Sequence, residues 1–273
     1  MKHFLRLDGI ERSDLDHIID LADSYDAGRG PVLTGAAALF FPAGSIRTRA
    51  SFERGLSLLG LQPIVFPPET LDKPEALEDV AGYLAQFVDL AVVRAEMSLL
   101  EGLAAHDHLP IINAMTGENH PCEVLSDLWA LRRRGKDITQ LRYAVVGAGE
   151  SNVVRAWFEA ARAFGLDMVQ ICPPGHEIDG VEHSHDVWEG VRGADVIATD
   201  APGARAGVMA PFRITTDVLE ATGTDVLLNP CPPFLRGREV SAGAISSAHF
   251  VGHEFKQALL PVQQAVVAWS MDV

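Results

Sequence analysis

Short apolar runs separated by amphipathic stretches recur along the whole chain, and this alternation constrains the fold more than any other feature. Short apolar runs suit strands that are buried on both faces, whereas the stretches between them repeat apolar residues at helical spacing. The strand-like runs are Ala37–Phe41, Pro63–Phe66, Leu90–Val93, Ile111–Ala114, Tyr143–Val146, Met168–Ile171, Asp195–Ala198 and Asp225–Leu228. The helical patterns include Leu15–Tyr25, Arg49–Leu59, Ala76–Phe87, Glu123–Leu131, Asn152–Phe164 and Thr216–Ala221. Strands that alternate with helices form βαβ units, so we expect an α/β fold of doubly wound parallel sheets.

The length of the chain and one charged stretch predict two domains. A chain of 273 residues is long for one compact domain and sufficient for two. The polar stretch 132–137 ends a helix just before the strand at Tyr143, which is typical of a domain joint. We therefore predict domains over residues 1–134 and 135–252. The last pattern, 253–271, predicts one closing helix, and the sequence leaves open whether it packs back on the first domain or stays with the second.

Composition excludes several classes of partner. The formal net charge of −15 disfavours nucleic acid and anionic membranes, yet it is compatible with a small anion in a local basic pocket. No apolar run approaches the roughly 20 residues of a membrane span, and the N-terminus lacks the apolar core of a signal peptide. The three cysteines are far apart and form neither a disulfide framework nor a metal-ligand pattern, so we expect a cytoplasmic protein. No ligand cluster is visible, and we predict no metal and no organic cofactor.

The segment 41–53 has the pattern of an anion-binding site. A strand ends near Gly44 and a helix begins within a few residues, and the first turn of a helix presents unpaired N–H groups and the positive end of its dipole. Ser45 and Thr48 add hydroxyl groups there, and Arg47 adds a guanidinium that is able to donate two parallel hydrogen bonds to a phosphate. Spacing alone fits a phosphate site and a solvated, arginine-rich helix start equally well.

The same segment resembles the phosphate loop of the aspartate/ornithine carbamoyltransferase family. That loop reads Ser-Thr-Arg-Thr-Arg and then Ser-Phe-Glu, and Ser45–Arg49 and Ser51–Glu53 stand in its place here. Three further segments match family motifs in the family order, and these are Lys73–Glu75, Val92–Arg94 and His120–Glu123. The matches cover most of the first domain. The resemblance implies a carbamoyl-phosphate domain followed by a Rossmann-like amino-acid domain, with the active site in the cleft between them.

The resemblance also implies a reaction and the roles of individual residues. The family transfers a carbamoyl group from carbamoyl phosphate to the amine of an amino acid. The residues implied to hold or activate the donor are Ser45, Ile46, Arg47, Thr48, Arg94, His120 and Glu123. The first four form the phosphate loop, while Thr48, Arg94 and His120 would point at the carbonyl oxygen. Lys73 resembles the lysine that reaches into a neighbouring subunit, which implies a homotrimer with shared active sites.

The second domain resembles the family less closely. Asn152 stands where the ornithine branch has an asparagine for the substrate carboxylate, and Asp200 where it has an aspartate for the substrate amino group. Cys231 and Pro232 lie in the block that the family writes His-Cys-Leu-Pro or His-Pro-Leu-Pro. We take these four residues as candidate acceptor-binding residues.

Four departures from the family pattern affect the prediction of substrate. Ile46 replaces a threonine of the phosphate loop, and Glu123 replaces the glutamine that accepts a hydrogen bond from the carbamoyl NH₂ group. Ala201–Arg205 replaces the Ser-Met-Gly of the ornithine branch, and the closing helix carries Gln263 and Gln264 where the family has an arginine. Because both acceptor anchors differ, we predict an amino-acid-like acceptor that is neither ornithine nor aspartate.

Three other hypotheses remain open at the level of sequence. The departures are compatible with a non-catalytic ligand-binding paralogue, or with a repurposed enzyme that uses the anion site for different chemistry with Glu123 as general acid or base. The third hypothesis is an NAD(P)-dependent oxidoreductase, because Gly147-Ala148-Gly149 after a strand partly resembles a dinucleotide-binding turn. It lacks the third glycine, and the next strand ends in Cys172-Pro173-Pro174 rather than in an acidic residue.

Overall fold

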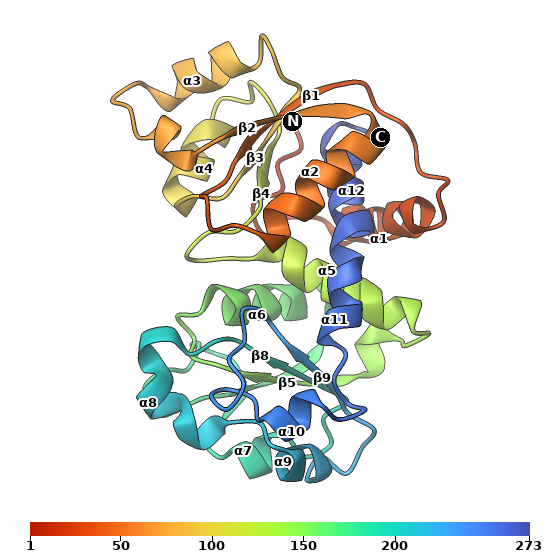
Figure 1. The fold of residues 1–273 in the computed structure, drawn as a ribbon, viewed down its shortest axis with the longest axis vertical. Helices are drawn as coiled ribbons and strands as arrows, with labels where there is room; N and C mark the ends of the chain where they lie inside the picture. The colour runs from red at the N-terminus through yellow and green to blue at the C-terminus, as the bar shows by residue number, and fades with distance from the viewer. The chain divides into compact units, whose positions relative to one another are not determined.

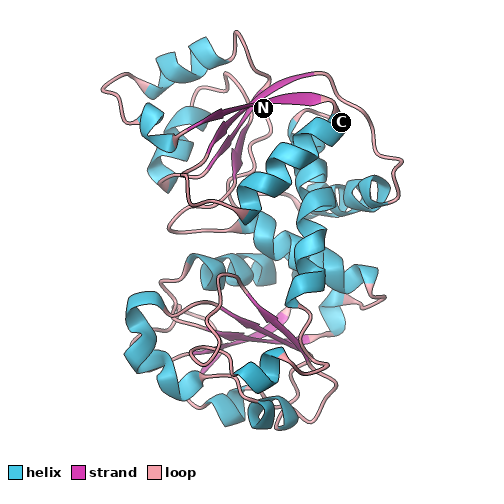
Figure 2. Cartoon of the chain, in the orientation of Figure 1, coloured by secondary structure: helices cyan, strands magenta, loops and turns pink.

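The computed structural model describes all residues from 1 to 273, and the chain divides into two compact units. Unit 1 comprises Met1–Trp129 and Gln257–Val273, and unit 2 comprises Ala130–Lys256. Each unit contains one fully parallel sheet, of four strands in unit 1 and five in unit 2, with helices around it (Figure 2). The predicted α/β class with two parallel-sheet domains is confirmed. None of the helices combines the length and the apolar character that a membrane crossing requires.

The sheet of unit 1 has the strand order β2-β1-β3-β4. Its strands are β1 (Gly35–Phe40), β2 (Leu61–Phe66), β3 (Leu90–Val93) and β4 (Ile111–Asn113). The helices of this unit are α1 (Arg12–Asp26), α2 (Arg47–Leu59), α3 (Leu77–Leu84), α4 (Met97–Ala104), α5 (Pro121–Arg133, which runs on into unit 2) and α12 (Leu259–Ser270). Helices α3 and α4 lie on one side of the sheet, and α1, α2 and α12 lie on the other (Figure 1).

The two ends of the chain meet in unit 1. Helix α12 packs against both α1 and α2 (Figure 1). The indole N–H of Trp269 donates to the Asp14 carboxylate at 3.0 Å, and its ring contacts Phe4 edge to face. Phe4 itself extends the sheet edge, because its N–H donates to the Ile111 carbonyl at 2.9 Å. The last helix is therefore part of the core of unit 1.

The sheet of unit 2 has the strand order β7-β6-β5-β8-β9. Its strands are β5 (Arg142–Val146), β6 (Asp167–Ile171), β7 (His183–Ser184), β8 (Val196–Thr199) and β9 (Leu227–Pro230). Its helices are α6 (Asn152–Phe164), α7 (Val187–Gly190), α8 (Ala206–Met209), α9 (Thr216–Glu220), α10 (Ala242–Ile245) and α11 (Gly252–Phe255). One face of the sheet is covered by α6, whose Trp157 packs on Tyr143 with ring centroids 5.7 Å apart.

All eight strand-like runs of the sequence overlap observed strands, but strand β7 and the helices α4, α7, α8 and α10 have no counterpart among the patterns named from the sequence. Strand β7 has only two residues, both polar, so it carries no apolar alternation that a sequence pattern could show. The single closing helix that we predicted is wrong. The structure has α11, a 3₁₀ turn at Lys256–Ala258, and then α12. Pro261 lies in the first turn of α12, and its missing N–H prevents the α-helix from continuing upstream.

Each sheet contains one point at which the strand order reverses. Strands on one side of this point follow one another toward one edge of the sheet, and the later strands follow one another toward the other edge. In unit 1 this point lies between β1 and β3, and in unit 2 it lies between β5 and β8. At such a point the loops that leave the carboxyl ends of the two strands turn to opposite faces and open a crevice, in which α/β proteins bind their ligands. The segments that follow these four strands are therefore where a site is expected on structural grounds alone.

Candidate active site

The segments after β1 and β3 place Ser45 beside Arg94. The chain leaves β1 at Phe40 and enters α2 at Arg47, and the Ser45 N–H closes a turn on the Pro42 carbonyl at 2.9 Å. Arg94 directly follows β3, and its N–H donates to the Phe40 carbonyl. Its guanidinium Nη1 donates to the Ser45 hydroxyl oxygen at 2.9 Å. The bond joins the two sides of the reversal point and fixes the orientation of the guanidinium.

Positive charge accumulates at this position. The pKa of Arg94 is lowered by burial and by the neighbouring charge of Arg47, and no carboxylate contributes in the opposite direction. Neither guanidinium forms an ion pair in the structure, whereas the nearby Arg49 is paired with Glu53 four residues on. Helix α2 begins here without a side-chain cap and without an acidic residue in its first turn. Two adjacent cations and the positive end of a helix favour a bound anion.

The other two residues of the loop differ in exposure. Thr48 is buried in the first turn of α2, while the Ile46 side chain is 74% exposed. The isoleucine therefore adds no apolar packing to the loop, and its backbone N–H donates to the Gly44 carbonyl at 3.0 Å. The threonine hydroxyl that the family has at this position has no substitute in the Ile46 side chain.

His120 and Glu123 are brought together where α5 begins. His120 immediately precedes the helix, and Glu123 lies in its first turn. Both side chains are buried, and the His120 Nε2 and Glu123 Oε2 atoms are 3.9 Å apart. A carboxylate in the first turn of α5 therefore lies beside an imidazole where the family has a neutral glutamine. The predicted donor residues of unit 1 thus include a buried acid–base pair.

Lys73 lies apart from these residues in sequence and surroundings. It is exposed in the loop between the 3₁₀ turn Pro68–Leu71 and α3, and it has no ion pair. The loop is held by a bond from the Glu75 N–H to the Lys73 carbonyl at 2.8 Å. Its side chain is therefore available to a partner.

In unit 2, Asn152 and Asp200 stand at the reversal point of the sheet. Asn152 is the first residue of α6, after β5, and Asp200 directly follows β8. Ser151, which caps α6, donates its hydroxyl proton to Asp200 Oδ2 at 2.6 Å. Burial raises the pKa of Asp200, while the hydrogen bonds from Ser151 and from the Ala201 N–H act against that shift. A mostly buried carboxylate without a cation nearby suits a substrate ammonium group.

Cys231 and Pro232 follow the next strand, β9. The Cys231 N–H donates to the Thr199 carbonyl at 2.8 Å, which places both residues beside the end of β8 that carries Asp200. The four predicted acceptor residues therefore share the carboxyl edge of the sheet of unit 2.

The partial dinucleotide motif has a different local role. Gly147 is tightly packed, because a Cβ there would lie 2.6 Å from a Val154 methyl carbon. The N–H groups of Val153 and Val154 at the start of α6 donate to the Ser151 hydroxyl, and the Gly149 N–H donates to the His176 carbonyl. The chain itself thus uses the N–H groups that would bind a pyrophosphate in a dinucleotide fold. This arrangement disfavours the NAD(P) hypothesis.

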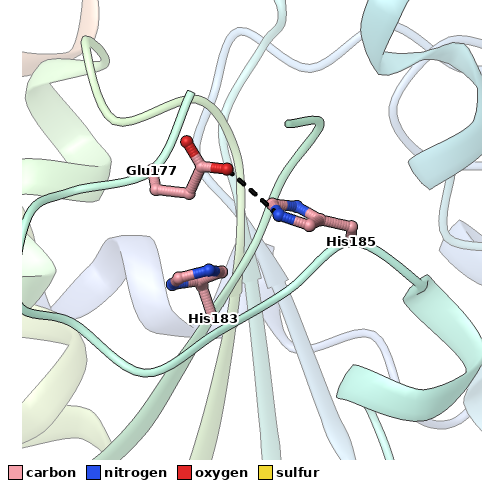
Figure 3. Close-up of side chains that lie close together, drawn as sticks. All are labelled: Glu177, His183 and His185. Carbon is pink, nitrogen blue, oxygen red and sulfur yellow. Dashed lines mark ion pairs between the residues drawn. The ribbon is translucent and has the colours of Figure 1, made fainter. Parts of the chain in front are cut away.

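The structure also brings together three side chains that the sequence analysis missed. Glu177, His183 and His185 each place a potential ligand atom within 4.8 Å of the other two (Figure 3). Our sequence analysis saw no ligand cluster, because Glu177 lies six residues from the nearer histidine. The alternation His-Ser-His was the available signal, since residues i and i+2 of an extended chain point to the same side.

Comparison with known proteins identifies the family of the chain. Residues 2–133 match the family description "Aspartate/ornithine carbamoyltransferase, carbamoyl-P binding domain", and residues 139–270 match "Aspartate/ornithine carbamoyltransferase, Asp/Orn binding domain". An ornithine carbamoyltransferase of Methanothermobacter thermautotrophicus is 31% identical, and the alignment covers 99% of each chain. The crystal structure of ornithine carbamoyltransferase from Gloeobacter violaceus matches with a TM-score of 0.90 at 26% identity over 99% of each chain. That of the Thermus thermophilus enzyme matches with a TM-score of 0.90 at 26% identity over 98% of each chain. The chain is a member of the aspartate/ornithine carbamoyltransferase family, a family of transferases.

Proposed function

We propose that the protein transfers a carbamoyl group from carbamoyl phosphate to the amine of an amino-acid-like acceptor. The observation that carries this proposal is the pair Arg47 and Arg94, two neighbouring guanidinium groups that have no carboxylate partner and lie at the reversal point of the sheet. A dianion such as the phosphate of carbamoyl phosphate would neutralise both. The family membership of the whole chain supports the same chemistry.

In the reaction, the nitrogen of a neutral amine forms a bond to the carbonyl carbon, the bond from that carbon to the phosphate oxygen breaks, and the departing phosphate takes up the proton that the amine loses. Ser45, Arg47 and Thr48 would hold the phosphate, and Arg94 and His120 would donate to the carbonyl oxygen as it gains negative charge. A fixed donor at a developing oxyanion contributes about 3 kcal/mol. Holding the two substrates together contributes roughly 7–11 kcal/mol more. Binding and orientation by the protein therefore suffice, without a metal or an organic cofactor.

Glu123 supports a second candidate function. Its buried carboxylate faces His120, and the same pair would serve as general acid and base for different chemistry at the anion site. Under the carbamoyltransferase proposal, the Glu123 carboxylate would add negative charge near the donor phosphate and would weaken donor binding. Turnover of carbamoyl phosphate separates the two candidates, since only the first consumes it.

For the acceptor, we propose an amine-bearing amino acid other than ornithine or aspartate. Asp200 and Asn152 would hold its amino and carboxylate groups. The segment that replaces Ser-Met-Gly ends in the 3₁₀ turn Gly203–Arg205, and Arg205 Nε lies 3.6 Å from the Glu150 carboxylate. Because Arg205 is already paired with Glu150, the acceptor proposal depends on the absence of Ser-Met-Gly here and of the arginine in the closing helix.

The test is a transfer assay with ¹⁴C-labelled carbamoyl phosphate and a panel of amino acids that includes ornithine, N-acetylornithine and aspartate. We expect labelled product with at least one amino acid, and a higher kcat/KM for that acceptor than for ornithine. A preference for ornithine would overturn the acceptor proposal alone. Absence of transfer to every amine, together with intact binding of phosphate, would favour the second candidate function.

We further propose that the active enzyme is a cytoplasmic homotrimer with shared active sites. The exposed Lys73 supports this assembly, and the lack of any disulfide among the three buried cysteines supports the compartment. Light scattering should give three times the chain mass. Lys73→Ala should lower kcat/KM for carbamoyl phosphate about tenfold without dissociating the trimer. A fully active monomer would contradict the shared site.

A further inference from the structure

Glu177, His183 and His185 form a cluster outside every residue of the proposed active site (Figure 3). Glu177 lies in the loop that follows β6, and the two histidines lie on and just after β7. No other group of three His, Cys, Asp or Glu side chains in residues 1–273 converges in this way. The proposed carbamoyl transfer therefore does not account for this cluster.

Hydrogen bonds to the backbone fix both imidazole rings. His183 Nδ1 lies 3.1 Å from the Val181 carbonyl oxygen, and His185 Nδ1 lies 3.0 Å from the Cys172 carbonyl oxygen. A carbonyl oxygen only accepts hydrogen bonds, so Nδ1 must carry the proton in each ring. In a neutral ring, Nε2 then presents a lone pair. Histidines that bind metals typically donate their other N–H to a carbonyl or carboxylate in this way.

The third side chain faces one of these lone pairs. Glu177 Oε1 lies 3.1 Å from His185 Nε2, and the Gly175 N–H donates to the same oxygen at 3.0 Å. Two lone pairs at this distance repel unless a cation lies between or beside them. That cation is either a proton on Nε2, which makes the contact a simple ion pair, or a metal ion bound by both atoms.

We propose that Glu177, His183 and His185 form a binding site for a divalent transition metal ion, with Zn²⁺ as the best fit. Two imidazole nitrogens and one carboxylate oxygen are a ligand set that suits Zn²⁺ and disfavours Mg²⁺ or Ca²⁺, which take oxygen ligands. The ligand atoms of a tetrahedral zinc site lie roughly 3.3 Å apart, given bond lengths of about 2.0–2.1 Å. The Glu177–His185 pair already has this spacing, and the ligand atom of the exposed His183 lies within 4.8 Å of both, so metal binding requires His183 to move closer. The fourth position is open to water.

The metal would tie the loop after β6 to the two-residue edge strand β7. That strand is attached to β6 by few hydrogen bonds, among them Gln170 N–H to the Glu182 carbonyl and Cys172 N–H to the Ser184 carbonyl. A metal ion that binds only the folded state stabilises it by mass action. We therefore infer a stabilising site for this edge of unit 2, and the inference does not depend on the proposed catalytic function.

The experiment is calorimetric titration of ZnCl₂ into the full chain after treatment with EDTA and desalting, with MgCl₂ as the comparison ion. We expect one Zn²⁺ per chain, no comparable binding of Mg²⁺, and at least tenfold weaker Zn²⁺ affinity in Glu177→Gln. In the double variant His183→Asn/His185→Asn, binding at this site should be lost. Titration with Co²⁺ adds a spectroscopic readout, since a tetrahedral Co²⁺ site absorbs strongly in the visible range and the double variant should not.

The chain offers a matched control in His106 and His108. These residues have the same His-x-His spacing and a nearby carboxylate, with His106 Nδ1 3.7 Å from Glu78 Oε1. Asp107 between them has φ +53°, so the segment is not extended and its side chains do not converge with Glu78 on one point. His106→Asn/His108→Asn should bind Zn²⁺ like the unaltered protein, and Zn²⁺ should raise the thermal midpoint of both.

Two results would overturn the proposal. One is Zn²⁺ affinity in the double variant equal to that of the unaltered chain, and the other is no measurable Zn²⁺ binding by the unaltered chain. Either would mean that Glu177 and His185 form only an ion pair. The single variants His183→Asn and Glu177→Gln change a surface histidine and a partly exposed carboxylate, so they keep the test informative should the double variant fail to fold.

Discussion

Ser45 and Arg94 are 49 positions apart in the chain, and their hydrogen bond defines the donor site at the scale of single residues. The bond requires a guanidinium, because the planar fork of arginine donates to Ser45 and still leaves N–H groups for a substrate. Lysine would keep the charge and lose this geometry. The residue scale is also where the sequence was most informative, since the motif residues Arg47 and Thr48 stand out without a structure.

Arg94→Lys should lower kcat/KM for carbamoyl phosphate by about 100-fold, the usual effect of removing one oxyanion donor. Arg49→Lys is the matched control, because Arg49 is paired with Glu53 on the side of α2 and should change kcat/KM by less than about threefold. Steady-state kinetics of both variants test the assignment. Equal losses in the two would remove the special role of Arg94.

Glu123→Gln restores the amide of the family and removes a buried negative charge beside His120. We expect the variant to bind carbamoyl phosphate roughly tenfold more tightly, a difference of about 1.4 kcal/mol, because a like charge near the phosphate dianion is lost. Calorimetric titration measures the change. Weaker binding in the variant would show that the carboxylate itself is needed, and would support the second candidate function.

Asp200 links substrate binding to stability. Because burial raises the pKa of Asp200 in the folded state, its proton is bound more tightly there than in the unfolded chain. Its stabilising contribution is therefore fully present below the unfolded pKa and is lost as the pH rises through the folded pKa. Burial thus makes the charged form of Asp200 costly in the folded state, and Asp200→Asn removes that cost while keeping an acceptor for Ser151.

The variant Asp200→Asn should raise the free energy of unfolding at pH 7 by about 0.5–2 kcal/mol and leave it nearly unchanged near pH 3. Its kcat/KM for the acceptor should fall by about 100-fold, because the substrate ammonium loses its counter-charge. Urea unfolding at the two pH values and transfer kinetics measure both effects. A loss of stability at pH 7 would contradict this account of the buried carboxylate.

At the scale of elements, the turn Gly147-Ala148-Gly149 after β5 is closely packed. This packing alone requires glycine at both positions, so the glycines do not imply that a dinucleotide binds there. A Cβ on Gly149 would lie 2.9 Å from an Ile178 side-chain carbon and 3.0 Å from the His176 carbonyl oxygen. The turn therefore supports the loop after β6, which also carries Glu177. The sequence motif alone did not distinguish this packing role from ligand binding, because both require a residue without a side chain.

Gly149→Ala should lower the free energy of unfolding by about 1–3 kcal/mol, since the loop backbone must move to admit the methyl group. Gly207 in α8 is the control, as a Cβ there meets nothing within 4 Å and its backbone needs no positive φ. Gly207→Ala should be neutral or stabilising. Urea unfolding of the pair measures the difference, and equal stability of the two variants would refute the close contact.

The core strands with strong apolar patterns were predictable, whereas β7, which is held by a few polar contacts, was not. The long core strands and α6 follow directly from their sequences. Strand β7 has two polar residues, and its pairing with β6 depends on where the preceding loop returns. The break between α11 and α12 follows from Pro261, which lies in the first turn of α12 and has no N–H to donate in a continuous helix.

At the scale of the whole molecule, the two parallel sheets share one topological feature. Each has a reversal point in its strand order, and each places candidate site residues on the segments that leave the two strands at that point. The sequence predicted the class of fold but not the strand order, and the candidate site residues stay predictions. The order depends on long-range pairing, and it is what joins Ser45 to Arg94 and Ser151 to Asp200.

The central claim is that the basic site of unit 1 binds carbamoyl phosphate, and calorimetric titration of the protein with that compound tests it most directly. We predict binding by the unaltered chain, competition by inorganic phosphate, and at least a 100-fold loss of affinity in Arg47→Ala, which removes one of the two cations. Absence of binding by the unaltered chain, or unchanged affinity in Arg47→Ala, would contradict the account.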